Sequence, residues 1–418
     1  MTTLTQPASG LLRHRDFLRL WAAQTVSDFG ARITREGLPM MAVMGLAASP
    51  SQLGILAALA NGPAILVGLA SGDFVDHTLR RPILIVTDLA RAAILVTLPI
   101  AAWLHLLTIW QVYAAAALVG AASVLFDIAD HAYLPGLVGR AQVTDANAKI
   151  SLTESVAEMG GPALAGMLFQ WLTAPIAVAV NAATYIASAL FLAQIRAAEP
   201  PLDATRKRLG WVDGVVTGAR TIWAEPRLRP LLFMTATGGL FGGFFSALYI
   251  VFVLRGLGLS PALLGLGIAA GGVGALAGSL LAQPMARWFG VGPAICAGGV
   301  LSALGTLIVL VAPTDTTGAM TCLVISQFLG DAFGVVPLIL ATSLRQVLFP
   351  PSVLGRVGAT FRALSGATVV VGALAGGALG QAFGLRQSLL AAIAGLMIGP
   401  LIGALSPLGR VREMPQDA

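Results

Sequence analysis

Charge and cysteine are both scarce in this sequence, and each shortage excludes a class of protein. Only 11% of the 418 residues are charged, against roughly 25% in soluble domains, whereas 57% are hydrophobic. A soluble core of this length could not enclose so much apolar surface, so the surplus is expected to face lipid. The two cysteines, Cys296 and Cys322, lie in apolar runs and provide neither a disulfide framework nor a metal-ligand spacing.

Catalytic and nucleotide-binding motifs are missing too. No Gly-x-x-x-x-Gly-Lys-Ser/Thr loop occurs in the sequence, which argues against direct drive by ATP. The four histidines are scattered, without a Ser/His/Asp arrangement. The net charge of +6 is dispersed among apolar segments rather than gathered on one face, so nucleic acid is not an expected partner. We therefore expect no enzyme, no metal and no cofactor.

What the chain does contain is a series of long apolar segments. A helix needs about 20 apolar residues to cross the hydrocarbon of a bilayer. Twelve segments meet this need, which predicts an all-α membrane protein with two pseudo-symmetric six-helix bundles. The predicted spans are 18–46, 51–74, 83–105, 108–131, 148–170, 174–195, 230–254, 261–285, 290–312, 318–344, 356–382 and 387–406.

The basic residues predict the orientation and the domain organisation. Nearly all of them fall on the side of the two termini, and only Arg255 and Arg386 fall opposite. By the positive-inside rule both termini are expected in the cytoplasm, with the chain in the inner (plasma) membrane. The expected domains are an N-terminal bundle (1–196), a linker (197–229) and a C-terminal bundle (230–418).

The linker contains one further helical pattern. Apolar residues recur at helical spacing over 211–223, beside Asp213 and Arg220, which predicts an amphipathic helix lying in the membrane interface. A plain soluble linker helix is the alternative.

The two halves resemble each other at a constant offset of 211 residues. Ser49-Pro50 matches Ser260-Pro261, and the same offset relates three pairs of glycines: Gly54 with Gly265, Gly161 with Gly372, and Gly166 with Gly377. Parallel repeats of six helices place a substrate site between the halves, near the middle of the membrane. The repeat therefore predicts alternating access by rocking of one half against the other.

The segment after the second predicted span carries a distinctive pattern. It reads Gly72-Asp73-Phe74-Val75-Asp76-His77-Thr78-Leu79-Arg80-Arg81. Through Gly72, Asp76, Arg80 and Arg81 it resembles the signature of the major facilitator superfamily, although His77 replaces the usual Arg and Leu79 the usual Gly. The resemblance implies the twelve-helix major facilitator fold.

The same residues suggest a gating latch. Asp76 at a helix end can face the positive N-terminus of another helix. We expect Arg80 and Arg81 to pair with Asp127 or Asp130 near the end of the fourth span, in a cluster that breaks when that side opens. Ordinary solvated loop charges are the alternative.

A second resemblance, to the branch of enterobactin exporters and macrolide efflux proteins, extends along most of the chain. It rests on short motifs in a fixed order, and it implies the branch rather than a substrate. The motifs are Trp21-Ala-Ala-Gln-Thr-Val-Ser, Asp88-Leu-Ala-Arg91, the run 126–137, Ala146-Asn147-Ala148, Gly161-Pro162, Asn181-Ala182-Ala183, Pro226-Arg-Leu-Arg-Pro230 and Gly355-Arg356-Val357. Within span 148–170, Gly161, Pro162 and Gly166 also resemble the Gly-Pro motif of superfamily antiporters, with a simple packing kink as the alternative.

Ionisable residues inside spans are expensive in a bilayer and are therefore candidates for function. The first span places its polar residues on one helical face, which must look inward. Most of the charge lies in the N-terminal half, which leaves the C-terminal half a smoother apolar wall. The candidate substrate- and proton-binding residues are Gln24, Asp28, Arg32, Arg35, Glu36, Glu154, Glu158, Asp331 and Arg362.

These residues allow a structural and a functional interpretation. In the structural one, Arg32 pairs with Asp28 and Glu36 at i,i+4 spacing and the first helix neutralises itself. In the functional one, Arg32 and Arg35 hold an anionic group, and one of the carboxylates carries the coupling proton. The candidates for this role are Glu154, Glu158, Asp28 and Glu36. Glu154 and Glu158 lie one turn apart without an obvious partner on their own helix, and two neighbouring carboxylates in a low-dielectric cavity would not both ionise easily.

The sequence thus predicts a monomeric secondary transporter that exports a small amphipathic molecule by proton antiport, with the proton gradient as its energy source. The expected partners are a small-molecule substrate, protons and the lipid bilayer. One alternative is a transporter of a lipid, a metal complex or an imported nutrient. Another is a membrane receptor that keeps the fold without transport.

Overall fold

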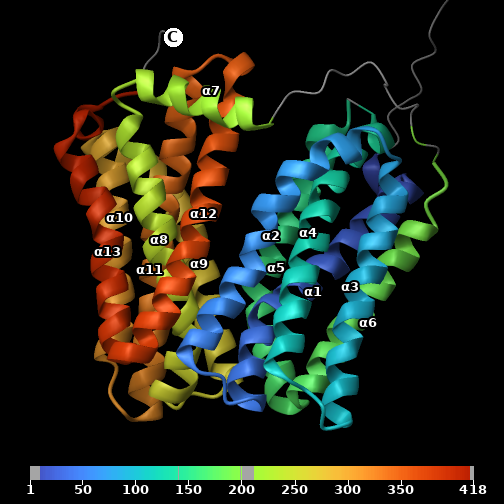
Figure 1. Cartoon of the computed structure of the whole chain (residues 1–418). Helices are drawn as coiled ribbons and strands as arrows, with labels where there is room; N and C mark the ends of the chain where they lie inside the picture. The colour runs from blue at the N-terminus through green and yellow to red at the C-terminus, as the bar shows by residue number, and fades with distance from the viewer. Residues whose placement is uncertain (1–9, 140, 198, 200–210, 415–418) are drawn as a thin grey trace, which may run out of the picture.

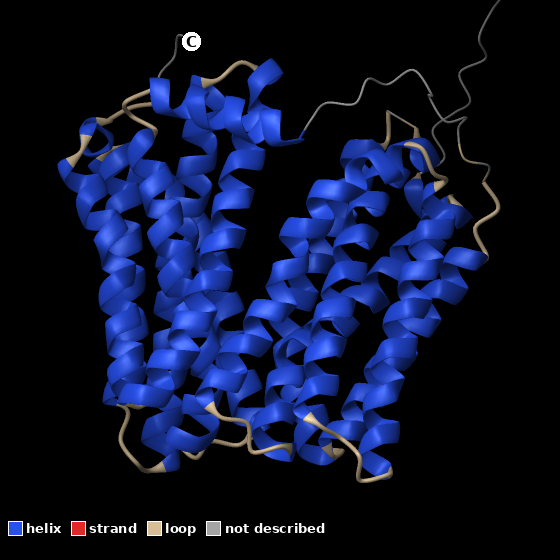
Figure 2. Cartoon of the chain, in the orientation of Figure 1, coloured by secondary structure: helices blue, strands red, loops and turns tan. Residues whose placement is uncertain are grey.

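The computed structural model describes residues 10–139, 141–197, 199 and 211–414, and the long elements in these ranges are all helices (Figure 2). Short 3-10 or π turns occur beside some of them. The helices are α1 (Arg15–Gly45), α2 (Pro50–Asp76), α3 (Arg80–Trp103), α4 (Ile109–Val138), α5 (Val143–Trp171), α6 (Ala174–Ala193), α7 (Trp211–Ala224), α8 (Arg229–Val251), α9 (Pro261–Phe289), α10 (Val291–Leu307), α11 (Thr316–Leu348), α12 (Pro351–Phe383) and α13 (Leu385–Leu405).

Each predicted span corresponds to one long helix, and the predicted linker helix forms α7. Among the described residues, 9 helices are long and apolar enough to cross a membrane by length and composition alone. Several helices continue past the predicted spans; α4, for example, ends at Val138 and α5 begins at Val143. The difference arises because hydropathy marks the hydrocarbon-length stretch, whereas backbone hydrogen bonding continues through the polar residues beyond it.

Polar caps fix the start of several helices at the loops. The Ser260 hydroxyl accepts a hydrogen bond from the backbone N–H of Leu263, and Asp315 accepts one from Gly318 at 2.7 Å. Thr108 and Gln111 form a reciprocal capping box at the start of α4. Such caps satisfy amide groups that have no partner within the helix, so these turns are set by local sequence.

Helices α1–α6 pack into one bundle and α8–α13 into a second, and the two bundles spread apart toward one end of the molecule (Figure 1). We call the end that holds the start of α1, α7 and the last turn of α13 the open end. Helix α7 lies across the open end of the second bundle, where the Thr360 hydroxyl of α12 donates to the Val215 carbonyl at 3.0 Å. Whether α7 also lies in a membrane interface stays a prediction.

The opposite end, which we call the closed end, holds the loops after α1, α3, α5, α8 and α10. Buried apolar side chains there form one continuous cluster that includes residues of both bundles, such as Leu53, Phe169, Phe244 and Leu264. At the open end the buried side chains divide into two separate clusters, one in each bundle. Burial therefore joins the halves at one end only and leaves them apart at the other.

Glycines allow the bundles to meet at the closed end. Gly54 of α2 lies against Gly377 of α12, where a Cβ on Gly54 would lie 2.8 Å from the opposing Cα. Gly166 of α5 lies against Gly265 of α9, where a Cβ on either residue would lie 3.1 Å from the other's Cα. Gly54 corresponds to Gly265 in the repeat, and Gly166 corresponds to Gly377. The offset of 211 residues therefore relates the two contacts to each other.

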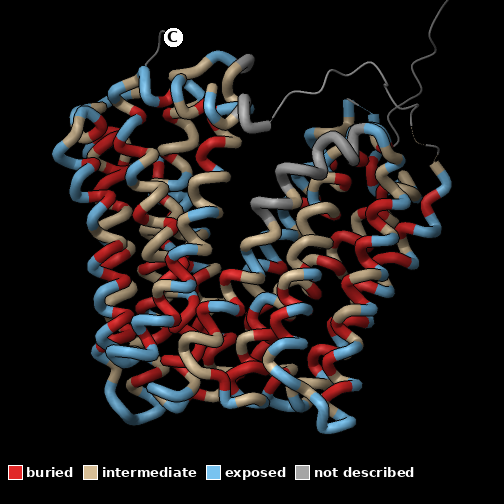
Figure 3. Tube along the Cα trace, viewed as in Figure 1, coloured by how far each residue is buried: buried red, intermediate tan, exposed pale blue. Residues whose placement is uncertain are grey.

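Exposed positions lie along the outside of both bundles, while buried positions gather inside them (Figure 3). Many of the exposed side chains are large and apolar. Trp103 is 80% exposed and Leu280 is 78% exposed. An apolar surface of this extent is unstable in water and matches the hydrocarbon of a bilayer. The chain is a multi-pass membrane protein.

Candidate functional site: a charged cavity between the bundles

A cavity of about 660 Å³ lies between the two bundles, on the open-end side of the glycine contacts. Its wall from the N-terminal bundle is strongly polar, whereas the wall from α9 and α11 is formed mainly by small or apolar side chains. The polar wall consists of Asp28, Arg32, Arg35, Asp127, His131, Glu154, Ser155 and Glu158. The opposing wall consists of Gly272, Ala275, Leu276, Ser279 and Val335.

The two arginines of α1 share one carboxylate of α5. Arg32 forms an ion pair with Glu158, and Arg35 Nη2 lies 3.1 Å from Glu158 Oε1. Arg35 Nε also donates to the buried carboxylate of Glu36 at 3.0 Å. The ion pairs therefore link α1 to α5, and they differ from the pairing within α1 that the structural interpretation predicted.

Gly161 of the helix-5 motif makes this pairing possible. A Cβ on Gly161 would lie 2.6 Å from Cβ of Arg32, so only a glycine leaves room for the arginine to cross α5. Pro162 follows directly with its carbonyl facing Gly265 of α9, and Gly166 lies a little over one turn nearer the closed end. The motif thus serves two contacts, one with α1 beside the cavity and one with α9.

Three carboxylates in the cavity wall are not neutralised in this way. In the part of the chain that the structure describes, no basic side chain lies within ion-pair distance of Asp28, Asp127 or Glu154. Gln24 is buried nearby and donates to Asp130 at 2.6 Å. Neither of these two residues lines the cavity. The polar wall thus holds more carboxylates than arginines that could pair with them.

The remaining predicted residues lie outside the cavity lining. Asp331 packs against Gly271 of α9, close enough for its charge to interact with Glu158 and Arg35. Arg362 lies on α12 near Arg345 and is not among the residues that line this cavity. Within the described ranges, no group of three His, Cys, Asp or Glu residues is arranged to hold a metal ion.

The two arginines of the predicted latch, Arg80 and Arg81, contact Glu199 and the end of α6 in this open conformation. The backbone N–H groups of Arg80 and Arg81 donate to the carboxylate of Glu199 at 2.7 and 2.8 Å, and the Arg81 guanidinium donates to the Leu192 and Ala193 carbonyls. Glu199 thereby caps the N-terminus of α3, a favoured place for an anion. In this conformation Asp127 lines the cavity and Asp130 accepts a hydrogen bond from Gln24. Because the latch is expected to break when this end opens, and this end is open here, its pairing with Asp127 or Asp130 stays a prediction.

The two remaining latch residues, Gly72 and Asp76, lie in the last turns of α2. The surroundings of both residues fall outside what the structure describes, and a gating role for this segment stays a prediction.

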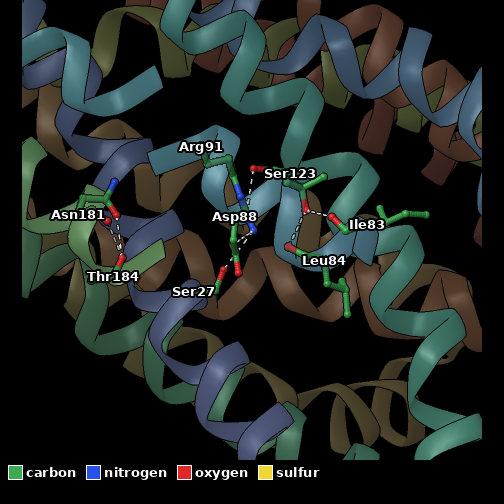
Figure 4. Close-up of polar contacts among 9 residues, drawn as sticks. Ser27, Ile83, Leu84, Asp88, Arg91, Ser123, Asn181 and Thr184 are labelled. Carbon is green, nitrogen blue, oxygen red and sulfur yellow. Dashed lines mark hydrogen bonds and ion pairs between the residues drawn. The ribbon is translucent and has the colours of Figure 1, made fainter. Parts of the chain in front are cut away.

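A buried ion pair on α3 escaped the list of predicted site residues (Figure 4). The Arg91 guanidinium pairs with Asp88 and lies between the rings of Phe126 and Tyr185, 4.4 and 4.3 Å from their centroids. Only 2% of Arg91 is exposed, so the pair is a fixed part of the bundle core. Its spacing of three residues was visible in the Asp88-Leu-Ala-Arg91 motif, but nothing in the sequence indicated the aromatic neighbours.

Comparison with known proteins identifies the kind of molecule that carries this cavity. A family model described as transmembrane secretion effector matches residues 7–418. The multidrug efflux pump Tap of Mycolicibacterium fortuitum is 25% identical over 409 residues, which cover 95% of this chain and 96% of Tap. The uncharacterized MFS-type transporter YfiS of Bacillus subtilis is 26% identical over 178 residues, or 43% of this chain and 42% of that protein.

Solved structures agree with the fold. A bacterial homolog of the human lysosomal transporter Spinster, in its inward-facing and occupied conformation, superposes with a TM-score of 0.74 at 15% identity, covering 97% of this chain and 98% of that one. At this identity the likeness concerns the fold alone. Together with the family match, it shows that the chain belongs to the transmembrane secretion effector family and is a membrane transporter of the twelve-helix major facilitator fold rather than an enzyme.

Proposed function

We propose that this transporter exports small amphipathic molecules in exchange for protons, by alternating access. The observation that carries the proposal is the cavity between the bundles, whose two walls differ in character. One wall gathers carboxylates and two arginines, and the other presents small and apolar side chains. An amphipathic molecule has a polar part for the first wall and an apolar part for the second.

The carboxylates suggest how protons take part. Asp28, Asp127 and Glu154 share a low-dielectric cavity, and no basic side chain among the described residues forms an ion pair with them, so binding of a proton relieves their mutual repulsion. Glu158 is held by Arg32 and Arg35, and its protonation would free both arginines to bind an anionic group of the substrate. Substrate and proton would thus compete for one charge cluster, which is the requirement for exchange.

The proposed direction is outward, from the cytoplasm. The open end carries most of the basic residues of the loops, so the positive-inside rule assigns it to the cytoplasm. The cavity would then be loaded from the cytoplasmic side in the conformation described here. The similarity to the efflux pump Tap supports the same direction.

Transport by reconstituted protein tests the coupling. A panel of amphipathic cations, anions and neutral drugs is ranked by thermal shift, and the strongest binder is followed in inside-out vesicles with an imposed pH gradient. A pH-sensitive dye reports proton movement at the same time. Glu154→Gln and Glu158→Gln, singly and together, are expected to lose pH-driven uptake, with the largest loss in the double variant.

Asp145→Asn is the matched control. Asp145 lies on the first turn of α5, outside the cavity, and pairs with Lys149 at 3.0 Å, so its neutralisation should leave transport unchanged. If the double variant keeps full pH-driven uptake, the carboxylates of α5 do not carry the proton. If no compound in the panel causes proton movement with the wild type, the proposal of antiport fails and a protein that binds without transport is favoured.

A further inference from the structure

A second cavity, of about 370 Å³, lies inside the C-terminal bundle. It is lined by residues of α8, α10, α11, α12 and α13, and it shares no lining residue with the charged cavity between the bundles. Helix α11 separates the two: Val335 faces the first cavity, whereas its neighbour Gly334 lines the second. A volume of this size falls within the range of small-molecule sites in proteins.

Small residues leave the space, and apolar ones surround it. Gly238, Gly299, Gly334 and Ser302 lie on its wall, and a Cβ added to Gly238 would have no atom within 4 Å. Leu338 lines the cavity while 65% of its surface is exposed. A ligand in this space would cover apolar area that the protein leaves uncovered, which favours binding of an apolar body.

Arg345 is the sole charged side chain in the described lining, and it lies toward the open end of α11. Its guanidinium stacks on the ring of Phe361, 4.3 Å from the centroid, and donates to Thr342 Oγ1 at 2.8 Å. No carboxylate among the described residues pairs with it, and its charged neighbour, Arg362, is a second cation. The site therefore has positive charge at one end that the protein does not neutralise.

The cavity is elongated, and in the described lining only one of its ends is charged. Gly334 and Arg345 are eleven residues apart on one helix, which corresponds to about 16 Å along the axis. A compact anion would use only the arginine end, and a neutral hydrocarbon would use only the apolar end. A molecule with an acidic head and an extended apolar body would use both.

We propose that this cavity binds an amphipathic carboxylate of the fatty-acid type, with its head at Arg345 and its chain toward Gly334. The site is separate from the proposed transport cavity, and its occupancy does not depend on proton exchange. Arg345 provides the charge-assisted contact that orients the molecule, and the glycines provide room for the chain.

Binding of dodecanoate to the full chain in phosphatidylcholine nanodiscs tests the proposal, with dodecanol as a neutral probe of equal chain length. The wild type is expected to bind dodecanoate about tenfold or more tightly than dodecanol, in line with the strength of hydrogen bonds to charged groups. Arg345→Gln should remove this preference, and Arg345→Lys, which keeps the charge, should restore most of it.

A variant that fills the cavity provides a second test of the proposal. Gly238→Leu is expected to weaken dodecanoate binding strongly, because its side chain would occupy the space. The matched control is Gly242→Leu, one turn further along α8, which also meets no atom within 4 Å but lies outside the cavity lining. Equal binding of acid and alcohol by the wild type, or dodecanoate binding that survives both Arg345→Gln and Gly238→Leu, would overturn the proposal; the latter would place the ligand elsewhere, such as at Arg32.

Discussion

The glycine contact between α2 and α12 gives a direct way to shift the transporter toward its other conformation. In Gly54→Ala the new Cβ would lie 2.5 Å from the Ala373 carbonyl oxygen and 2.8 Å from Cα of Gly377. Ordinary contacts of a Cβ begin near 3.4 Å, so the two helices must separate by about 1 Å. Both neighbours are backbone atoms and cannot rotate away, so the strain falls on the contact itself.

The free-energy cost of the added methyl group can be bounded. Overpacking a tight contact costs about 1–3 kcal/mol, and the cost applies only while the closed end stays closed. The gain in helix propensity from Gly to Ala applies to both conformations and cancels. A bias of this size changes the ratio of the two conformations by about 5- to 150-fold. Gly54→Ala is therefore expected to populate a conformation with the closed end parted.

Electron–electron distance measurements between two spin labels report this opening. Leu106, after α3, and Val311, before α11, are 64% and 68% exposed at the closed end and lie in different bundles. Labels there, in a background with both native cysteines replaced, should show a longer distance in Gly54→Ala than in the wild type.

The matched control is Gly62→Ala on the same helix. Its Cβ would meet Val370 at 4.0 Å, an ordinary contact, so its distance distribution should match that of the wild type. If Gly54→Ala folds and also gives the wild-type distribution, the glycine contact does not hold this end closed and the reasoning fails.

Three further predictions concern the bundles and the linker. Arg91→Leu strands the buried Asp88 carboxylate and should lower stability by about 3–5 kcal/mol, whereas Asp88→Asn combined with Arg91→Leu should recover much of the loss in a thermal-unfolding assay. The hydrogen bond from Arg227 holds the pKa of Glu225 below its usual range, so its contribution is present at neutral pH and lost as the pH falls through that lowered pKa; the difference in melting temperature between the wild type and Glu225→Gln should vanish on acidification. Gly218→Leu places a Cβ 2.5 Å from a backbone oxygen of α12 and should speed amide exchange throughout α7; unchanged exchange would show that this contact does not dock the helix.

Hydropathy and spacing were sufficient for the helices and for the faces that carry charge. The apolar segments predicted the long helices, and the spacing over 211–223 predicted α7. The three- and four-residue spacing on α1 grouped five residues, of which Asp28, Arg32 and Arg35 line the cavity, whereas Gln24 and Glu36 are buried outside its lining. Such patterns are local, so one sequence is enough to read them.

Partners across helices could not be read in the same way. Periodicity says which face of a helix is polar but not which neighbour it meets, so the pairing of Arg32 with Glu158 was not foreseen. The contact of Glu199 with the start of α3 was not foreseen for the same reason, because Glu199 follows α6 in the chain and reaches α3 only through the fold. Likewise, the rings of Phe126 and Tyr185 come to Arg91 from two other helices.

The two glycine contacts at the closed end have a consequence for the origin of the chain. Gly54 meets Gly377 and Gly265 meets Gly166, so the partners are exchanged between equivalent positions of the two halves. This reciprocity defines an isologous interface, in which one surface patch meets a second copy of itself around a two-fold axis. A single six-helix half would therefore have the complementary surface needed to form a homodimer with both contacts, and the present interface matches that of such a dimer after duplication and fusion.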